Sequence, residues 1–339
     1  MIIQVGNINS KITGSISYQE SLNEKLLKNF TKEVISVSEK KNKILRFLHI
    51  VWTILRNIKK TKLVIIHSFS TKAFYITFLT ALLCRLIRIK YFVLVHGGNY
   101  PARIQSSPAF VKMIFSYSSK NLSPSKYLQF HFSKLGYVFD FVPNAIDLSL
   151  FKFKERVNFK PNLLWVRAFD TIYNPQMAVF VVSLLKLNFP DVKLWMVGFK
   201  CDHSYEDTIE LIKKLNLNDN IIITGVLTHR MWAELSTEAD IFINTTNIDN
   251  MPVSVLQAMA LGLPVFSTNV GGIEWLIEDN ENGIKCKVGN ADFMANKIKW
   301  YLENQTELKR IATNAVNIPR EYEWAKVLPI WGELLKKYI

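Results

Sequence analysis

The stretch from Ile241 to Leu276 constrains the fold of this chain more than any other part of the sequence. It begins with a short β-branched and aromatic run, Ile241 to Asn244. A helical stretch follows from Val253 to Leu261, and an extended pattern returns from Pro264 to Thr268. This order predicts a strand, a loop, a helix and a second strand, the arrangement from which parallel α/β sheets are built.

The loop between this strand and this helix has the features of an anion-binding site. Asp249 and Pro252 precede the helix, and the N–H groups of a first helical turn have no partners within the helix. A helix start also carries partial positive charge, so it suits an anion such as a diphosphate. The residues predicted to bind it are Asn250, Met251, Pro252, Val253 and Ser254.

An ordered series of residues runs through this helix and beyond it. Along the chain it reads Asp249, Gln257, Ala258-Met259-Ala260, Gly262, Pro264 and Gly271-Gly272. The series resembles the donor-site signature of the family-4 retaining glycosyltransferases of the GT-B fold, in which two glutamates precede Ala-Met-Ala, Gly-x-Pro-Val and Gly-Gly. An ordinary strand and helix of any α/β protein would explain the apolar pattern but not this order.

Asp249 and Gln257 stand where that family has its two glutamates. In the family the first glutamate lies near the donor sugar and the diphosphate, and the second accepts hydrogen bonds from the ribose hydroxyls. The resemblance therefore implies a catalytic role for Asp249 and a donor-binding role for Gln257. The carbonyl oxygen of a glutamine can still accept such a bond.

Arg167 follows another predicted strand, Leu163 to Val166, at its carboxyl end. The family has a cation at this position, which neutralises the diphosphate leaving group, and the resemblance implies that catalytic and binding role for Arg167. The family also has a Lys a few residues further on. That Lys is missing here, which leaves Tyr173 or Asn174 as a replacement donor.

His96 follows the predicted strand Tyr91 to Val95 and precedes two glycines. The carboxyl ends of parallel strands are where α/β sheets bind ligands. The family carries a similar His-Gly near the donor sugar and the acceptor. We predict a catalytic role for His96, with a purely structural histidine as the alternative.

Four further residues are candidates for ligand binding through the same resemblance. Gly225 and Val226 correspond to the family's strand-end position beside the nucleobase. Gly14 and Ser15 lie in the first loop, which faces the cleft between the domains in GT-B enzymes. Simple turn chemistry explains these last two residues equally well.

The organisation of the chain points to two domains. Strands alternate with helices along most of the sequence, which predicts parallel, doubly wound sheets, and 339 residues are enough for two cores. The resemblance implies an α/β GT-B fold, with two Rossmann-like domains facing a cleft. We predict an acceptor-side domain over residues 1–150, a nucleotide-sugar domain over 161–320, and over 321–339 a helix that crosses back to the first domain.

The composition of the chain indicates which partners it binds and in which compartment it lies. The net charge of +14 indicates an anionic partner, but no helix-turn-helix, zinc-finger or RNP-type signature accompanies it, so nucleic acid is not predicted. Cys84, Cys201 and Cys286 lack metal-ligand spacing and predict reduced thiols in a cytoplasmic protein. The first five residues read as a strand and not as a signal peptide, which also predicts a cytoplasmic location.

The segment from Lys40 to Lys62 is cationic and amphipathic. Apolar residues such as Phe47 and Trp52 alternate there with Lys and Arg at helical spacing. The segment could lie on an anionic membrane surface, or it could be a domain helix with one solvated face. The sequence leaves both alternatives open.

The reaction predicted from the resemblance is transfer of a sugar, with retention, from a nucleotide-sugar donor to the hydroxyl of a sugar or lipid-linked acceptor. No Asp-x-Asp occurs in the chain, so we predict metal-independent catalysis and no cofactor besides the donor. A basic, peripheral enzyme fits surface polysaccharide or glycolipid biosynthesis on the inner face of the cytoplasmic membrane.

Two alternatives to this reaction remain. A catalytically silent GT-B scaffold that only binds a nucleotide sugar would explain Gln257 and the missing Lys. An NAD-dependent Rossmann oxidoreductase is disfavoured because no Gly-x-Gly-x-x-Gly follows a predicted strand.

Overall fold

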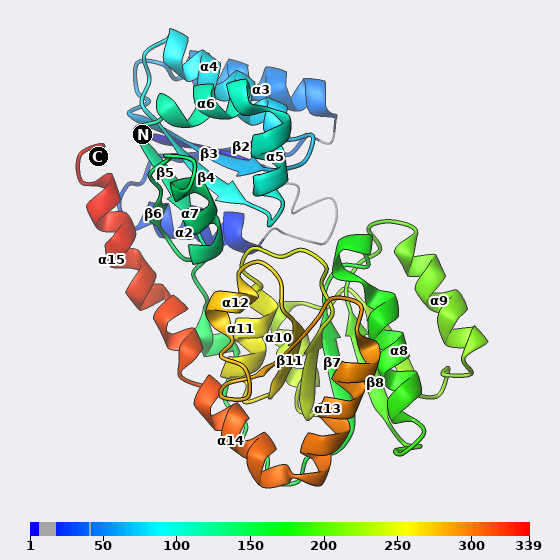
Figure 1. Cartoon of the computed structure of the whole chain (residues 1–339). Coiled ribbons are helices and arrows are strands. Elements are labelled where there is room, and N and C mark those ends of the chain that lie inside the picture. The colour runs from blue at the N-terminus through cyan, green and yellow to red at the C-terminus, as the bar shows by residue number, and fades with distance from the viewer. Residues whose placement is uncertain (7–17, 41) are drawn as a thin grey trace. The chain divides into compact units, whose positions relative to one another are not determined.

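The computed structural model describes residues 1–6, 18–40 and 42–339, which form two compact units (Figure 1). The first unit combines Met1–Ala145 with Trp324–Ile339, and the second is Ile146–Glu323. Each unit contains a six-stranded parallel sheet with helices on both faces, which confirms the predicted fold class. Gly14 and Ser15 lie outside the described residues, so their predicted contacts remain predictions.

The sheet of the first unit has the strand order β2-β1-β3-β4-β5-β6. Its strands are β1 (Ile2–Val5), β2 (Val34–Val37), β3 (Leu63–Phe69), β4 (Tyr91–His96), β5 (Lys120–Ser123) and β6 (Asp140–Phe141). All neighbours pair in parallel. The chain therefore moves outward from β1 to β2 and then returns to the other side of β1, so the strand order reverses between β1 and β3.

Alternate residues of these strands face two different cores. Ile3 and Val64 pack with helices on one face, and Ile2 and Leu63 pack with helices on the other. The first face is covered by α3 (Lys43–Arg56), α4 (Phe74–Leu86), α5 (Tyr100–Ser106), α6 (Pro108–Ser116) and α7 (Lys126–Ser133). The second is covered by α2 (Tyr18–Lys28) and α15 (Trp324–Leu335), whose Val327, Trp331 and Leu335 are buried at a four-residue spacing.

The sheet of the second unit has the order β12-β11-β10-β7-β8-β9. Its strands are β7 (Asn162–Val166), β8 (Lys193–Val197), β9 (Ile221–Gly225), β10 (Ile241–Asn244), β11 (Val265–Thr268) and β12 (Ile284–Cys286). The order reverses between β7 and β10, because β8 and β9 extend one side of β7 and the chain then returns to the other side. Open α/β sheets bind ligands outside the carboxyl ends of the strands at such a reversal.

Helices cover both faces of this second sheet as well (Figure 1). Leu163 and Trp165 share one core with α8 (Pro175–Leu185), α9 (Ser204–Lys214) and α13 (Ala291–Glu303). Leu164 and Phe242 share the other with α10 (His229–Leu235), α11 (Val253–Ala260) and α12 (Ile273–Leu276). Helix α14 (Gln305–Ala315) and the short 3₁₀ turns η1 (Leu148–Leu150), η2 (Thr171–Tyr173) and η3 (Ile318–Tyr322) complete the unit.

Residues 151–160, which separate the two predicted domains, lie within the second unit. Its Arg156 is buried, and the guanidinium donates to the carbonyl oxygens of Leu261 (2.7 Å), Ser236 (2.8 Å) and Ala239 (3.0 Å). Burial lowers the pKa of Arg156 to about 10. One side chain thus satisfies three carbonyls from distant turns, which ties the segment to the unit.

Candidate functional site

Arg167 and Asp249 meet where the strand order of the second sheet reverses. Arg167 follows β7 and Asp249 lies in the loop after β10. The Nη2 atom of Arg167 lies 2.5 Å from Oδ2 of Asp249, and its Nε donates to Oδ1 of Asn244, the last residue of β10, at 3.2 Å. Both members of the ion pair are largely buried, with side chains 13% and 11% exposed. Arg167 is therefore held in one orientation at the ligand-binding edge of the sheet.

The loop that carries Asp249 is fixed by its own hydrogen bonds. Oδ1 of Asp249 accepts from the N–H of Asn250 at 2.7 Å, so one carboxylate holds both Arg167 and the loop backbone. Further back, the N–H of Asn247 donates to the carbonyl of Ile172 at 2.7 Å. These contacts leave the loop little freedom to rearrange.

Gly271 and Gly272 allow a second segment to approach this loop closely. A Cβ atom added to Gly271 would lie 1.7 Å from the carbonyl oxygen of Asp249, and one added to Gly272 would lie 1.7 Å from that of Asn250. No side chain fits at either distance. Both glycines are thus required for the loop to occupy this position. The sequence alone indicated only that the two glycines belong to the ordered series that begins at Asp249.

Gly272→Ala tests this close approach directly, because Gly272 has an ordinary φ of −71° and an alanine there meets no backbone strain. We expect a loss of about 1–3 kcal/mol in the free energy of unfolding, as for other overpacked sites. We also expect up to ~100-fold weaker binding of a nucleoside diphosphate, since displacements of about 1 Å have effects of that size.

Gly289→Ala is the matched control for that variant. Gly289 has a φ of +74° and nothing within 4 Å of an added Cβ, so its substitution adds backbone strain without a clash. Chemical unfolding and calorimetry should show a stability loss alone in this variant. Wild-type ligand affinity in Gly272→Ala would contradict the assigned role of the close approach.

Helix α11 presents hydrogen-bond donors on its first two turns. Pro252 occupies the N-cap position and no side chain caps the helix, so the N–H groups of Val253 and Ser254 remain available. The buried Oγ of Ser254 and Nε2 of Gln257 are two of eight buried side-chain atoms without a hydrogen-bond partner among the described residues. What distinguishes these two is their place on the helix that follows the Asp249 loop, where both are available to donate to a ligand.

Met251 can contribute to this site only through its backbone. Its side chain is buried in the core that packs against α11, with Val255 and Met259. The predicted binding segment therefore divides into a core residue, Met251, and the helix start that follows it.

Tyr173 and Asn174 differ in how they fit the role of the missing Lys. The guanidinium carbon of Arg167 lies 5.0 Å from the centre of the Tyr173 ring, a cation–π contact. The side chain of Asn174 is already engaged: its Oδ1 accepts from the N–H of Met177 as the cap of α8, and its Nδ2 donates to Asn247. Asn174 therefore keeps one N–H of its amide for a ligand, and it carries no charge.

Gly225 and Val226 lie at the end of β9, the edge strand of the sheet, and β8 separates them from β7. Gly225 has a φ of +73°, which favours glycine on conformational grounds alone. Their contact with a nucleobase stays a prediction.

His96 pairs with a second histidine in the first unit. His67 on β3 and His96 at the end of β4 lie on neighbouring strands, with Nδ1 of His67 2.8 Å from Nε2 of His96 and the rings nearly parallel. At that distance one nitrogen donates and the other accepts. Burial lowers the pKa of His96 from 6.5 to about 4 and the pKa of His67 well below its ordinary value. The pair is therefore neutral at physiological pH.

This pair makes the stability of the protein depend on pH. Because the folded pKa values are depressed, the unfolded chain binds protons below pH 6.5 that the folded pair does not. We expect stability to fall as the pH decreases from 6.5 towards 4, by on the order of 1–3 kcal/mol. Urea unfolding at pH 7 and pH 4.5 measures the difference.

His96→Gln should show a smaller difference between the two pH values than the wild type. The control is His203→Gln, since the His203 side chain is 75% exposed. An unchanged pH dependence in His96→Gln would exclude the pair as its source.

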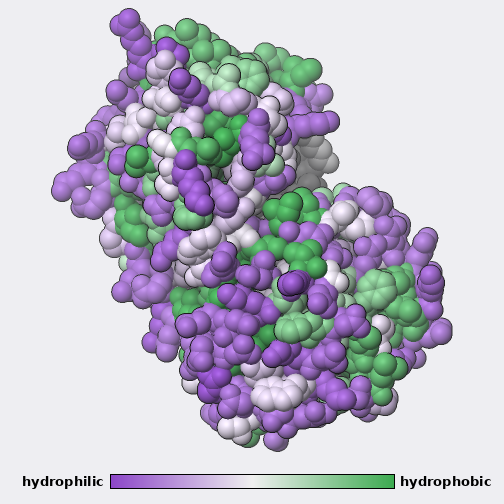
Figure 2. All heavy atoms as spheres, in the orientation of Figure 1, coloured by the Kyte–Doolittle hydropathy of each residue, from purple (hydrophilic) through white to green (hydrophobic). Residues whose placement is uncertain are grey.

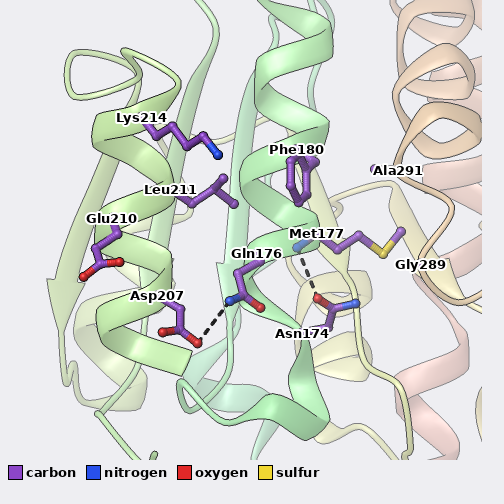
Figure 3. A pocket seen from close by; sticks show the side chains of 10 residues that line it. All are labelled: Asn174, Gln176, Met177, Phe180, Asp207, Glu210, Leu211, Lys214, Gly289 and Ala291. Atoms are coloured by element: carbon purple, nitrogen blue, oxygen red, sulfur yellow. Dashed lines mark hydrogen bonds between the residues drawn. The ribbon is translucent and has the colours of Figure 1, made fainter. Parts of the chain in front are cut away.

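A separate cavity of about 490 Å³ lies between α8, α9 and the start of α13 (Figure 3). It is lined by Asn174, Gln176, Met177, Phe180, Asp207, Glu210, Leu211, Lys214, Gly289 and Ala291. Gln176 donates to Asp207 across it. Arg167, Asp249 and Gln257 do not line this cavity, so its size alone does not make it the active site.

Metal ligands are not clustered in the part of the chain that the structure describes. Within residues 1–6, 18–40 and 42–339, no group of three His, Cys, Asp or Glu side chains is arranged to hold a metal ion.

The second unit of the chain matches a known protein family. Residues 150–317 match the family model described as "Glycosyl transferases group 1". The second unit is therefore similar to the group 1 glycosyl transferases. It contains β7 to β12 and the whole Arg167–Asp249 site.

Relatives of the group 1 domain differ in their named activities. N-acetyl-alpha-D-glucosaminyl L-malate synthase of Bacillus anthracis is 29% identical over 120 residues, which is 35% of this chain and 30% of that protein. The lipopolysaccharide core biosynthesis glycosyltransferase LpsE of Rhizobium meliloti is 24% identical over 127 residues, 36% of this chain and 35% of that protein. The matches thus span about a third of each relative's length.

A solved structure matches the fold over nearly the whole chain. HepE of Anabaena, in complex with UDP and glucose, has a TM-score of 0.80 and 15% identity, and the match covers 99% of both chains. The fold is therefore GT-B.

Proposed function

We propose that the chain is a retaining glycosyltransferase that moves a sugar from a nucleotide-sugar donor to an acceptor hydroxyl. The observation that carries the proposal is the meeting of Arg167 and Asp249 at the strand reversal, one loop before a helix start with unpaired donors. The phosphate oxygens of a nucleoside diphosphate would accept hydrogen bonds from these unpaired donors. The match to the group 1 family supports this class of reaction.

In this proposal Arg167 and α11 bind the diphosphate together. Arg167 uses Nη2 and Nε for Asp249 and Asn244, which leaves Nη1 for a phosphate oxygen. The first-turn N–H groups of α11 and Oγ of Ser254 donate to the same group. Donors fixed before the reaction stabilise the charge that develops on the leaving oxygens without reorganising.

Asp249 has two roles in this arrangement. It orients Arg167, and its charge offsets that of the guanidinium until a ligand with more negative charge arrives. Its carboxylate accepts from hydroxyls of the donor sugar in the proposed complex, the role that the family resemblance implies.

Gln257 binds the ribose as a donor in this proposal. Nε2 is the atom without a partner, so it donates to a ribose hydroxyl oxygen. The sequence had indicated an acceptor at this position. Whether Gln257 donates or accepts, the ribose in this proposal lies beside the second turn of α11.

The acceptor and setting are proposed from the same features. We propose a sugar or lipid-linked sugar acceptor, surface polysaccharide or glycolipid biosynthesis, and a position on the cytoplasmic face of the membrane. LpsE, named for lipopolysaccharide core biosynthesis, supports this class of pathway. Metal-independent catalysis is also proposed, and unchanged turnover in EDTA is the expected result.

A second candidate is a GT-B scaffold that binds a nucleotide sugar without turning it over. The ion pair favours it, since Asp249 offsets the charge of Arg167 and the uncharged amide of Asn174 supplies no second cation in place of the missing Lys. Turnover of a bound nucleotide sugar would exclude this candidate.

A thermal-shift screen against UDP-, GDP- and other nucleotide sugars tests the proposal, because a ligand that binds the folded state raises its stability. For the nucleotide sugar that binds, we expect Gln257→Leu to cost about 1–3 kcal/mol of affinity by leaving a ribose hydroxyl unpaired. Transfer or slow hydrolysis of that donor should accompany binding in the wild type.

The matched control is Gln176→Leu, which removes a glutamine amide from the same unit at the separate cavity of Figure 3. It should bind the nucleotide sugar as the wild type does. Equal affinity in both variants would move the ribose away from α11, and no shift with any nucleotide sugar would contradict the proposed function.

A further inference from the structure

Helix α3 in the first unit exposes large apolar side chains to solvent. They are Ile44, Leu45, Leu48, Trp52 and Leu55, each 45% to 71% exposed. Successive residues of an α-helix are rotated by about 100°, so these five positions fall within an arc of about 100° on one side of α3. They form the outer face of α3.

The core does not need these side chains. A different side of α3 packs on the unit, through Arg46, Ile50, Thr53 and Ile54. The sequence pattern suggested a single apolar stripe, and the structure has apolar residues on two sides. Apolar residues of a domain helix usually pack in the core, but those of the outer face do not.

The surroundings of the outer face are basic. Helix α3 contains no Asp or Glu, and none occurs anywhere between Glu39 and Asp140, whereas Lys and Arg recur throughout that stretch. Arg56 lies over the ring of Trp52, 4.9 Å from its centre. Lys59 and Lys60 follow at the helix end and are exposed.

The neighbouring helix α4 extends this surface. It packs beside α3 and exposes Tyr75, Leu79 and Leu86, with Arg85 next to the last of these. Figure 2 shows hydrophobic atoms along the edge of the first unit where Figure 1 places α3 and α4. Large apolar side chains are thus exposed on two neighbouring helices of this unit.

We propose that the outer face of α3 is an interfacial anchor that inserts into a bilayer containing anionic phospholipids. The apolar side chains enter the acyl region, and Arg56, Lys59 and Lys60 contact lipid phosphates. Trp52 and Arg56 form a pair suited to the headgroup level. None of the helices within residues 1–6, 18–40 and 42–339 could cross a bilayer.

Charge argues against other occupants of this face. A second copy of the chain would bring two acid-free, basic surfaces together, at a cost in electrostatic energy. Nucleic acid would match the charge but would leave the aliphatic side chains of the outer face in water. An anionic bilayer satisfies both the charge and the apolar area, and this inference does not depend on sugar transfer.

Co-sedimentation of the full chain with vesicles tests the anchor. We expect binding to vesicles of phosphatidylglycerol and phosphatidylcholine, and much weaker binding to phosphatidylcholine alone. L45E/L48E should lower the partition coefficient by at least tenfold, because each leucine loses apolar burial. Lys59→Glu with Lys60→Glu should lower it by roughly fivefold or more per position. High salt should weaken binding without abolishing it, since the apolar part is not screened.

The controls are Leu187→Glu and Lys213→Glu with Lys214→Glu, which change exposed residues of the same types in the second unit. They should bind vesicles as the wild type does, and circular dichroism should show that all variants fold. Wild-type binding by L45E/L48E, or no binding of the wild type to anionic vesicles, would overturn the proposal. So would a dimer in sedimentation equilibrium that L45E/L48E dissociates, because the face would then be a contact between copies.

Discussion

The ion pair between Arg167 and Asp249 joins two residues that are 82 positions apart, and the geometry of the ligand-binding edge in the second unit depends on it. The pair forms because the parallel sheet reverses its strand order between β7 and β10, which brings the carboxyl ends of these strands together. Asn244 holds Arg167 from a third direction and in turn donates to Ser267 on β11. Three adjacent strands thus determine where one guanidinium lies.

The same pair sets the electrostatics of the site. In the proposed complex Arg167 shares its charge with Asp249, so donors that carry no counter-charge assist it in binding the diphosphate. These are the first-turn N–H groups of α11 and Ser254 Oγ. The close approach of Gly271 and Gly272 holds the loop in front of that helix start. We propose that these fixed dipoles take the place of the missing Lys.

The sequence predicted the fold class, and the structure brings together Arg167 and Asp249, two of the residues that it singled out in the second unit. The strands before Arg167 and after Ile241 were readable because each is a short apolar run followed by a polar or glycine-rich turn. Asn244 was missed as a site residue, although its place at the end of a strand was predicted. Its contact with Arg167 depends on which strands are neighbours, and that order is a tertiary property.

Three other features could not be predicted from the sequence because they also depend on tertiary packing. The role of Arg156 depends on three carbonyls from turns some 80 to 105 positions away. The partner of His96 lies on the neighbouring strand, 29 positions earlier. Both sides of α3 carry aliphatic residues, so the sequence pattern did not show which side packs on the unit.

We propose that Arg167 binds the diphosphate while Asp249 holds the guanidinium in place. Calorimetry of a nucleoside diphosphate with the wild type, Arg167→Ala and Asp249→Asn separates these two roles. We expect Arg167→Ala to weaken binding by about 2–4 kcal/mol, in the range for charge-stabilising donors. Asp249→Asn should keep or increase affinity, because it removes the charge that offsets the guanidinium. Wild-type affinity in Arg167→Ala would show that the diphosphate does not bind Arg167.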